Sequence, residues 1–353
     1  MKTFALVTLG CLVTAPAGAQ WITHPTSGIP RTPDGKPNLS APAPRTADGK
    51  PDLSGLWRID SGGYGNDVTS DLKPGEVQPW ADKLFKERLE DLGKDHTSVQ
   101  CLPSGPGYST GGATAKIVQT PALIVILYED MTYRQIFLDG RGLPQEPNPS
   151  WMGYSIGRWE GDTLVIESGG FNDRTWLDFG GHPHTEALRM IERMRRVDFG
   201  RIEMHVTLED PKVYARSFTI PVDVKLMPDT ELIEYVCNEN EKDRARLVGK
   251  ASDEKKYKVD VPVATLTKYA GAYEFRAPED PTVVTVINFT VQGDELFMDF
   301  AGKGSEALIP VSGTVFAARG VRVRFAPDAT GAVNEAYAQI VEGEIKGVRK
   351  RSN

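Results

Sequence analysis

Between residues 115 and 237 the sequence is a succession of short segments in which apolar and polar residues alternate. Alternation with a period of two sends successive side chains to opposite faces of a β-strand. Turn residues separate the segments; Glu160-Gly161-Asp162, for example, lies between the predicted strands Tyr154–Trp159 and Thr163–Ser168. About eight strands follow, the number typical of a small closed barrel or a two-sheet sandwich. We therefore predict a mainly β, antiparallel fold.

Two further segments complete the predicted architecture. Pro79–Leu92 begins with a proline, carries an apolar stripe and is followed by Gly93, which predicts a helix. Residues 266–348 contain a second series of short strands, after which the basic tail at 346–351 is predicted to be solvated. Because 353 residues exceed the usual size of one core, we predict a main domain at 56–259 and a smaller β domain at 260–353.

The N-terminus has the pattern of a secretory signal peptide over residues 1–19. Lys2 precedes the apolar run Phe4–Val13, and Ala17-Gly18-Ala19 forms a small-residue cleavage site. The run is too short to span a bilayer, and no later segment is long and apolar enough to do so. We therefore expect a soluble protein in the periplasm or secreted from the cell.

Export places the remaining cysteines in an oxidising compartment. Once Cys11 leaves with the signal peptide, Cys101 and Cys237 remain. A disulfide between them is the natural inference, and two buried thiols are the alternative.

Residues 20–55 form a segment rich in proline and glycine that contains a near-repeat. RTPDGKPNLS at 31–40 is followed by RTADGKPDLS at 45–54. Each Asp-Gly is a turn signal, and a residue before proline favours an extended backbone. We predict an extended arm that wraps the body of the protein or links it to the cell envelope.

The net charge of −7 argues against nucleic acid and anionic membrane surfaces as partners, because both require basic patches. A small molecule is the expected ligand or substrate. The sequence leaves the oligomeric state open.

The residues 151–196 hold the densest mixture of aromatic, acidic and basic side chains. His182, His184 and Glu186 occupy alternate positions, so an extended backbone would place them on one face. Imidazole and carboxylate groups together suit a divalent metal ion, whereas no organic cofactor is indicated. The alternatives are a metal-free acid–base site and a hydrogen-bonded turn without chemistry.

A second hypothesis concerns Asp173 and Asp178, either of which could pair with His182 or His184. Such a pair fixes the imidazole tautomer for general acid–base catalysis, and Arg174 would hold an anionic or carbonyl group. The competing interpretation is that both carboxylates cap turns. Three further side chains are candidates for substrate binding. For Trp159 and Trp176 the alternative is core packing, and for Arg134 it is a side chain that extends to solvent.

Nucleophile motifs are less convincing. Gly153-Tyr154-Ser155-Ile156-Gly157 matches G-x-S-x-G, but a hairpin follows it where the nucleophile elbow requires a helix. Ser70–Lys73 matches S-x-x-K, but Pro74 disrupts the helix that this motif opens.

Two resemblances add to this prediction. The segment LTKYAGAYEF…VVTVINFTVQGDELFMDFAG resembles the accessory lipocalin-like β domain appended to bacterial β-lactamase-like hydrolases, and it covers about the last 85 residues. That resemblance implies a small barrel without catalytic residues. The motifs CLPSGPG, PSWMGYSIGRWEGDTLVIE and GFNDRTWLDFGGHPHTEAL, within residues 45–240, resemble an uncharacterised family of secreted bacterial proteins, and no activity is implied.

Three functions are consistent with these observations. The first is an exported enzyme that acts on a small organic or carbohydrate-like substrate by His/Asp acid–base chemistry, with or without a metal. The second is a calycin-like barrel that binds or carries a small ligand, and the third is an envelope scaffold. The clustering of titratable groups beside aromatic residues favours the first.

Overall fold

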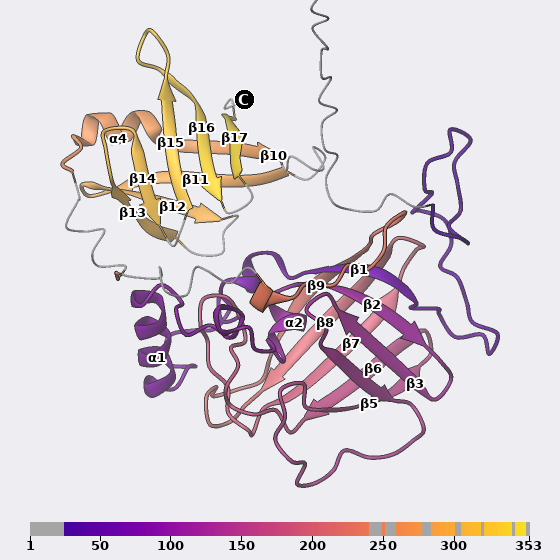
Figure 1. Cartoon of the computed structure of the whole chain (residues 1–353). Coiled ribbons are helices and arrows are strands. Elements are labelled where there is room, and N and C mark those ends of the chain that lie inside the picture. The colour runs from indigo at the N-terminus through magenta and orange to yellow at the C-terminus, as the bar shows by residue number, and fades with distance from the viewer. Residues whose placement is uncertain are drawn as a thin grey trace, which may run out of the picture.

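The computed structural model describes residues 25–239, 249–250, 259–276, 284–300, 305–318, 321–340 and 343–350. It contains two closed β-barrels, one of nine strands and one of eight (Figure 1). The predicted signal peptide and most of the charged segment 238–259 lie outside the described residues. The mainly β fold class is confirmed.

The main barrel is an ordered ring in which each strand pairs with the next along the chain and β1 pairs with β9. The strands are β1 Gly55–Asp60, β2 Ala113–Gln119, β3 Leu123–Tyr128, β4 Tyr133–Phe137, β5 Tyr154–Glu160, β6 Thr163–Gly169, β7 Arg189–Arg196, β8 Arg201–Glu209 and β9 Phe218–Leu226. A closed ring with an odd number of strands cannot alternate in direction throughout. The exception here is the parallel pair β4 and β5.

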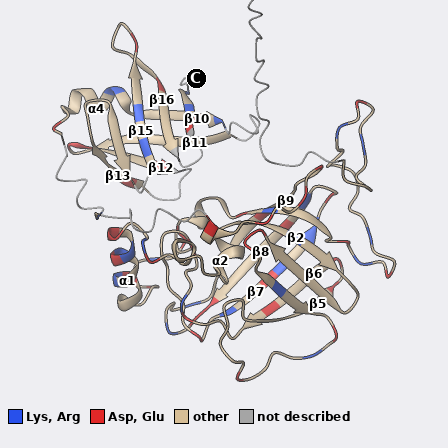
Figure 2. Cartoon of the chain, viewed as in Figure 1, with Lys and Arg blue, Asp and Glu red and all other residues tan. Residues whose placement is uncertain are grey.

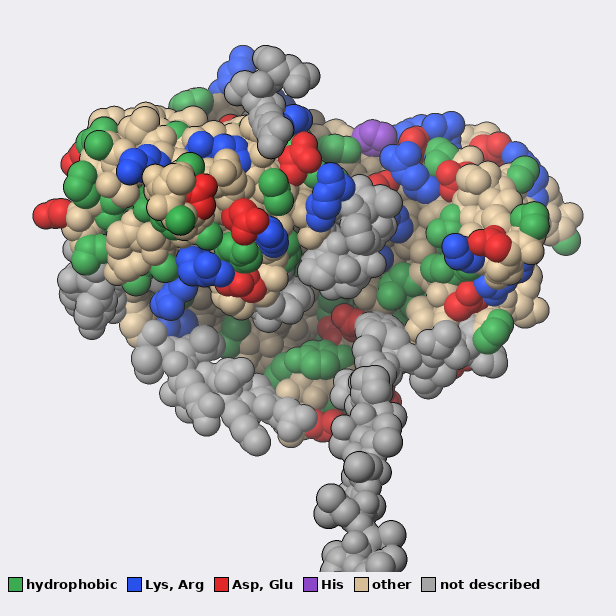
Figure 3. Space-filling view, turned by 90° about the horizontal axis from the view of Figure 1, so that it is seen from above, with side chains coloured by type: hydrophobic (Ala, Val, Ile, Leu, Met, Phe, Trp, Pro, Cys, Tyr) green, Lys and Arg blue, Asp and Glu red, His purple; other side chains and the backbone are tan. Residues whose placement is uncertain are grey.

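The interior of this barrel is filled by side chains from every second position of its strands. The apolar core runs from Trp57 in β1 to Leu226 in β9, and both residues are at least nine-tenths buried. On the outer face, charged residues pair across strands, as in Arg195–Glu203 and Arg201–Asp223. Figure 2 shows acidic and basic residues interspersed along the chain, and Figure 3 shows their side chains interspersed on one face of the described surface. The alternation of the sequence thus sorts side chains between core and solvent.

The two ends of the barrel are built differently. At one end, called the loop end here, β2, β4, β5, β7 and β9 begin; residues 61–112 and 170–188 lie at this end. The segment 61–112 contains four short or medium helices: η1 Gly62–Gly65, α1 Pro79–Glu90, η2 Thr97–Gln100 and α2 Gly107–Thr110. The helix predicted from residue 79 is therefore confirmed as α1.

The opposite end, called the arm end, is joined by the N-terminal segment 25–54. Its near-repeat is also structural: Thr32 and Thr46 each accept a backbone hydrogen bond from the glycine three residues later, at 2.8 and 2.9 Å. Arg31 donates to both carboxylate oxygens of Asp229, and Arg45 donates to both of Asp162. These two contacts fasten the segment 25–54 to the main barrel.

The second barrel contains α4 Val263–Tyr269 and eight antiparallel strands. The strands are β10 Gly271–Arg276, β11 Val284–Gln292, β12 Glu295–Phe300, β13 Ser305–Pro310, β14 Val315–Ala318, β15 Val321–Pro327, β16 Val333–Ile340 and β17 Gly343–Arg349. β17 closes the ring on β10, so the described residues from 346 onward belong to the barrel and not to a tail, although Lys346 and Lys350 are half exposed to solvent as predicted. The core is aromatic, with Tyr269 stacked on Phe325 at 4.4 Å.

Candidate functional site

The connection between β6 and β7, residues 170–188, crosses the loop end and holds most of the predicted site residues. Trp176 and Pro183 form an isolated antiparallel bridge, and Leu177 donates a backbone hydrogen bond to His182 at 2.9 Å. The connection therefore folds back on itself, which brings His182 against Asp178. The imidazole Nδ1 lies 2.6 Å from Asp178 Oδ2, and both side chains are almost fully buried.

Asp178 is the centre of a hydrogen-bonded network. Its carboxylate accepts the backbone N–H groups of Val68, Gly181 and His182 at 2.7–3.0 Å. The carboxylate therefore orients the imidazole and ties the connection to the segment 61–112. The other ring nitrogen, Nε2, lies 3.0 Å from Thr69 Oγ1, and Phe85 stacks on the ring at 3.8 Å.

A metal ion could be held at this pair, but with different residues from those predicted. In the described part of the chain, Asp67, Asp178 and His182 form a group whose ligand atoms lie within 4.8 Å of one another. His182 Nε2 and Asp67 Oδ1 are 3.8 Å apart. His182 would bind the ion through Nε2, and Asp178, which lies within hydrogen-bond distance of Nδ1, would orient the imidazole as the carboxylate of a carboxylate–histidine–metal arrangement does.

The predicted ligand set His182, His184 and Glu186 is not brought together. His184 Nε2 lies 2.6 Å from Thr175 Oγ1 and Nδ1 lies 3.2 Å from the Thr185 carbonyl oxygen, whereas Glu186 is exposed. The prediction that the three share a face is wrong because a turn begins at Glu186. Burial lowers the pKa of His184, so its imidazole is uncharged at neutral pH.

Asp173 and Arg174 are also separated from the buried pair. Both side chains are exposed at the start of the connection, and the Arg174 backbone N–H donates to Asn172 at 3.2 Å. Of the acid–base pairs considered from the sequence, the structure assembles Asp178 with His182.

The three residues predicted to bind substrate lie in three different places. Trp159 is next to the β5–β6 hairpin at the arm end, 6.0 Å from Lys50 Nζ, so it is distant from Trp176 at the loop end. Arg134 lies inside the barrel, where it pairs with Glu192 and donates to Ser155 Oγ at 3.0 Å. Ser155 is thus a buried residue within a strand, in agreement with the hairpin that was predicted to follow the G-x-S-x-G match.

A cavity of about 170 Å³ opens at the loop end beside Trp176 and Asp178. It lies between the beginning of β2, the β3–β4 turn, α2 and the connection 170–188. Its walls are formed by His96, Ser98, Ser104, Gly107, Tyr108, Gly111, Gly112, Ala113, Thr114, Tyr128, Glu129, Asp130, Trp176, Asp178, Phe179 and Tyr235. Asp178 belongs to this lining, whereas its partner His182 does not.

Three titratable groups of the cavity, Glu129, Tyr108 and His96, have shifted pKa values. Burial raises the pKa of Glu129, and Arg58 and Thr114 oppose this shift. Burial and the hydrogen bond to Asp130 raise the pKa of Tyr108 to about 12. Burial lowers the pKa of His96 to about 4, so this imidazole is uncharged at neutral pH.

His96 gives a pH-dependent stability. Above its unfolded pKa of 6.5 the imidazole is neutral in both states. As the pH falls from 6.5 towards 4, the unfolded chain gains a proton that the folded chain does not, so stability falls by up to about 3 kcal/mol. In His96→Asn, a side-chain acceptor for Ser98 N–H is kept and this loss should shrink; urea denaturation between pH 7.5 and 4.5 measures it. An unchanged pH slope would contradict the assignment.

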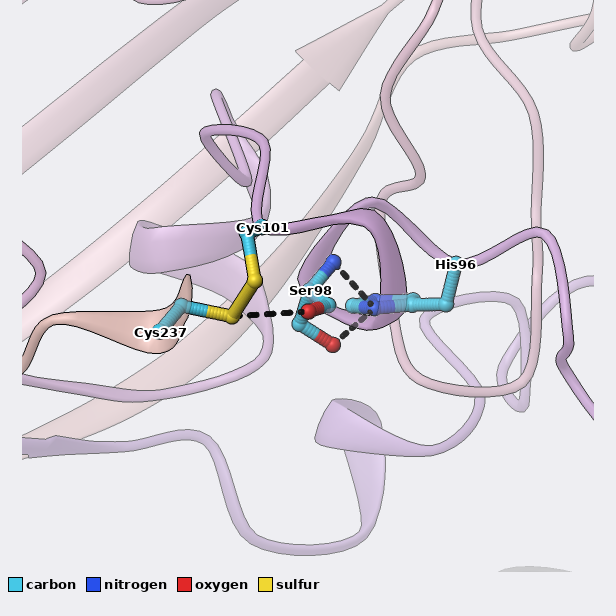
Figure 4. The surroundings of a disulfide bond; sticks show 4 residues. All are labelled: His96, Ser98, Cys101 and Cys237. Atoms are coloured by element: carbon cyan, nitrogen blue, oxygen red, sulfur yellow. Dashed lines mark hydrogen bonds between the residues drawn. A yellow bond between two sulfur atoms is a disulfide. The ribbon is translucent and has the colours of Figure 1, made fainter. Parts of the chain in front are cut away.

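The predicted disulfide is confirmed. Cys101 and Cys237 are bonded, with their Cα atoms 5.5 Å apart, which is within the range for an ordinary disulfide. Figure 4 shows the bond next to Ser98, whose carbonyl oxygen is 3.6 Å from Cys237 Sγ, with His96 on the far side of Ser98. Since His96, Ser98 and Tyr235 all line the cavity, the disulfide joins two of its walls.

Sequence comparison gave no relative: no family model and no curated protein matches the chain. Among solved structures, a crystal structure of a point mutant of the fluorescent protein UnaG is similar. It has 12% sequence identity and a TM-score of 0.23, and the match covers 51% of this chain and 97% of that chain. At this TM-score the likeness carries no functional argument. Among the helices of the described residues, none combines the length and hydrophobicity that a membrane span requires.

Proposed function

We propose that this protein binds a small organic ligand in the cavity at the loop end of the main barrel. The observation that carries the proposal is a concave site of about 170 Å³ in which aromatic rings and a few polar groups converge. Small-molecule sites typically combine apolar walls with a small number of positioned polar side chains. The mouths of β-barrels are common places for them.

The cavity is supported by rigid parts of the fold. Tyr108 stacks on Tyr128 with ring centroids 4.2 Å apart, and Tyr128 is a buried residue of β3. Trp176 contacts His96 edge-to-face at 4.9 Å, with Arg88 above its ring at 4.5 Å. Rings fixed in this way lose little conformational entropy when a ligand binds.

Ligand-observed NMR with a library of small aromatic, carboxylate and amine fragments tests the proposal. We expect at least one class to bind the wild-type chain. Ala113→Leu, which adds volume to the lining, should weaken that binding at least about fivefold, because overpacking costs about 1–3 kcal/mol. Ala187→Leu is the control, since Ala187 is half-buried outside the lining. Absence of binding from every class would contradict the proposal.

Acid–base catalysis at His182 is the second candidate. It is favoured by the 3.0 Å contact between Nε2 and Thr69 Oγ1, because Thr69 is half-exposed and an oriented imidazole could exchange a proton there. The same experiment decides it. A bound fragment that mass spectrometry finds unchanged after incubation excludes this role for that compound, whereas turnover that His182→Gln abolishes supports it.

We also propose that the protein acts outside the cytoplasm, in the periplasm or after secretion. Support comes from the signal-like residues 1–19 and from the Cys101–Cys237 bond, because structural disulfides persist in oxidising compartments. The assignment to a family of secreted β-rich proteins rests on its sequence motifs alone.

A further inference from the structure

We propose that the ligand of the loop-end cavity is a small organic cation, with an amine or quaternary ammonium group held between carboxylates and aromatic rings. This inference rests on the proposed function, since it names the chemical class that the same cavity would accept. Two features of the lining carry it: the sign of its charges and the exposure of its rings.

The charged groups of the lining are carboxylates. Glu129, Asp130 and Asp178 contribute, whereas no lysine or arginine of the described residues lines the cavity. The neighbouring guanidinium, Arg58, lies outside the lining, with NH1 3.5 Å from Thr114 Oγ1. The cavity is therefore a negative site in a protein whose outer charges are interspersed.

Two of these carboxylates have no basic side chain in direct contact, although Arg58 acts on Glu129 from outside the lining. Asp130 accepts hydrogen bonds from the Tyr108 hydroxyl and from Thr132, which are uncharged donors. Neither Glu129 nor Asp130 forms an ion pair with a lysine or arginine of the described residues. A cation in the cavity would supply a direct ion-pair partner for both carboxylates. Asp178, by contrast, is already satisfied by His182 and three backbone N–H groups.

Two aromatic side chains at the cavity are more than half exposed. Phe179 is 57% exposed and Tyr235 is 58% exposed, and both belong to the lining. The face of an aromatic ring attracts a cation, and this attraction strengthens as water is excluded. Rings that would cost free energy to leave in water are thus positioned to cover the apolar groups of an ammonium ligand.

Choline and its uncharged carbon isostere, in which carbon replaces the nitrogen, provide a matched pair of probes. We expect the full chain to bind choline at least tenfold more tightly than the isostere, as measured by calorimetry. Benzoate serves as the anionic probe and should bind more weakly than either. The preference for choline should decrease at high salt, because screening weakens the attraction to Glu129 and Asp130.

Substitutions separate the two features. Glu129→Gln should reduce choline affinity about fivefold to tenfold and leave the isostere unchanged; Glu186→Gln, which removes the same charge from an exposed turn outside the lining, is the control. Phe179→Leu keeps an apolar side chain but removes the ring, and it should reduce the affinity for choline about threefold. Both positions are partly or largely exposed, so the fold should be unaffected.

The outcomes distinguish this inference from the one on which it rests. If choline and its isostere bind equally, or if benzoate binds more tightly, the inference of a cationic ligand is overturned. If that binding is still weakened by Ala113→Leu, the proposed binding site is retained. Absence of binding by all probes and all library fragments would overturn both. Loss of choline binding in Glu186→Gln as large as in Glu129→Gln would also overturn the inference, because the charge would then act at long range.

Discussion

Replacing Glu192 by glutamine will destabilise the main barrel by about 3–5 kcal/mol, because it leaves the Arg134 guanidinium charged and unpaired inside the barrel. The two side chains are 3% and 2% exposed. Glu192 Oε1 accepts from Arg134 NH1 at 3.0 Å and from Ser109 at 2.8 Å, and Arg134 NH2 donates to Ser168 at 2.7 Å. No second carboxylate of the described residues forms an ion pair with this arginine.

The double variant Arg134→Met/Glu192→Leu should recover at least half of that loss. Apolar side chains of similar volume remove the desolvation cost of both charges, and such replacements of buried ion pairs are often neutral or better. Ser155 and Ser168 still have each other as partners, at 2.9 Å. Urea denaturation followed by tryptophan fluorescence measures the free energy of unfolding.

A matched pair on the outside of the same barrel is the control. Arg195 and Glu203 join β7 to β8 at 2.8 Å but are 57% and 35% exposed. Glu203→Gln should therefore change the free energy of unfolding by less than about 1 kcal/mol. If Glu192→Gln has an effect as small as Glu203→Gln, the interior pair does not act as a desolvated ion pair.

Loss of the disulfide will have the second large effect. The double variant Cys101→Ser/Cys237→Ser opens a loop whose ends are 136 residues apart in sequence. The chain-entropy model gives a loss of about 5 kcal/mol for a loop of this size, with native-state strain reducing it. The bond also holds Tyr235 near Ser98 and His96, so ligand binding should weaken together with stability.

Reduction provides an independent check of the same bond. Wild-type protein in dithiothreitol should denature at the same urea concentration as the double serine variant. The variant itself should not respond to dithiothreitol, which controls for other effects of the reductant. An identical midpoint for oxidised wild type and the variant would show that the bond adds no stability.

Strand positions were predictable where apolar and polar residues alternate regularly. β8 and β9 alternate throughout, and both lie within the region 115–237 that is predicted to be β. β1 and β17 were missed for different reasons. β1 directly follows the proline-rich arm, at the predicted start of the main domain, whereas β17 carries Lys346 and Arg349 and has few apolar residues.

The candidate site was predictable only where its partners are close in sequence. Asp178 and His182 are four residues apart, and their pairing was one of the combinations considered. Asp67, Thr69 and His96 come from the segment 61–112, which has little regular periodicity, so no pattern connects them to residue 182. The separation of Trp159 from Trp176 could have been predicted. Trp159 lies next to the turn of the β5–β6 hairpin, Trp176 follows its open end, and the turn and the open end lie at opposite ends of the barrel.

The N-terminal arm is synthesised before the residues with which it pairs. Arg45 pairs with a residue 117 positions later, and Arg31 with one 198 positions later. Since a ribosome makes the chain from the N-terminus, the arm emerges before either of these docking sites exists. The partner of Arg45, Asp162, is made before the partner of Arg31, Asp229, which lies beyond the strand that closes the barrel. Of the two copies of the near-repeat, the one that is made first therefore has its partner residue made last.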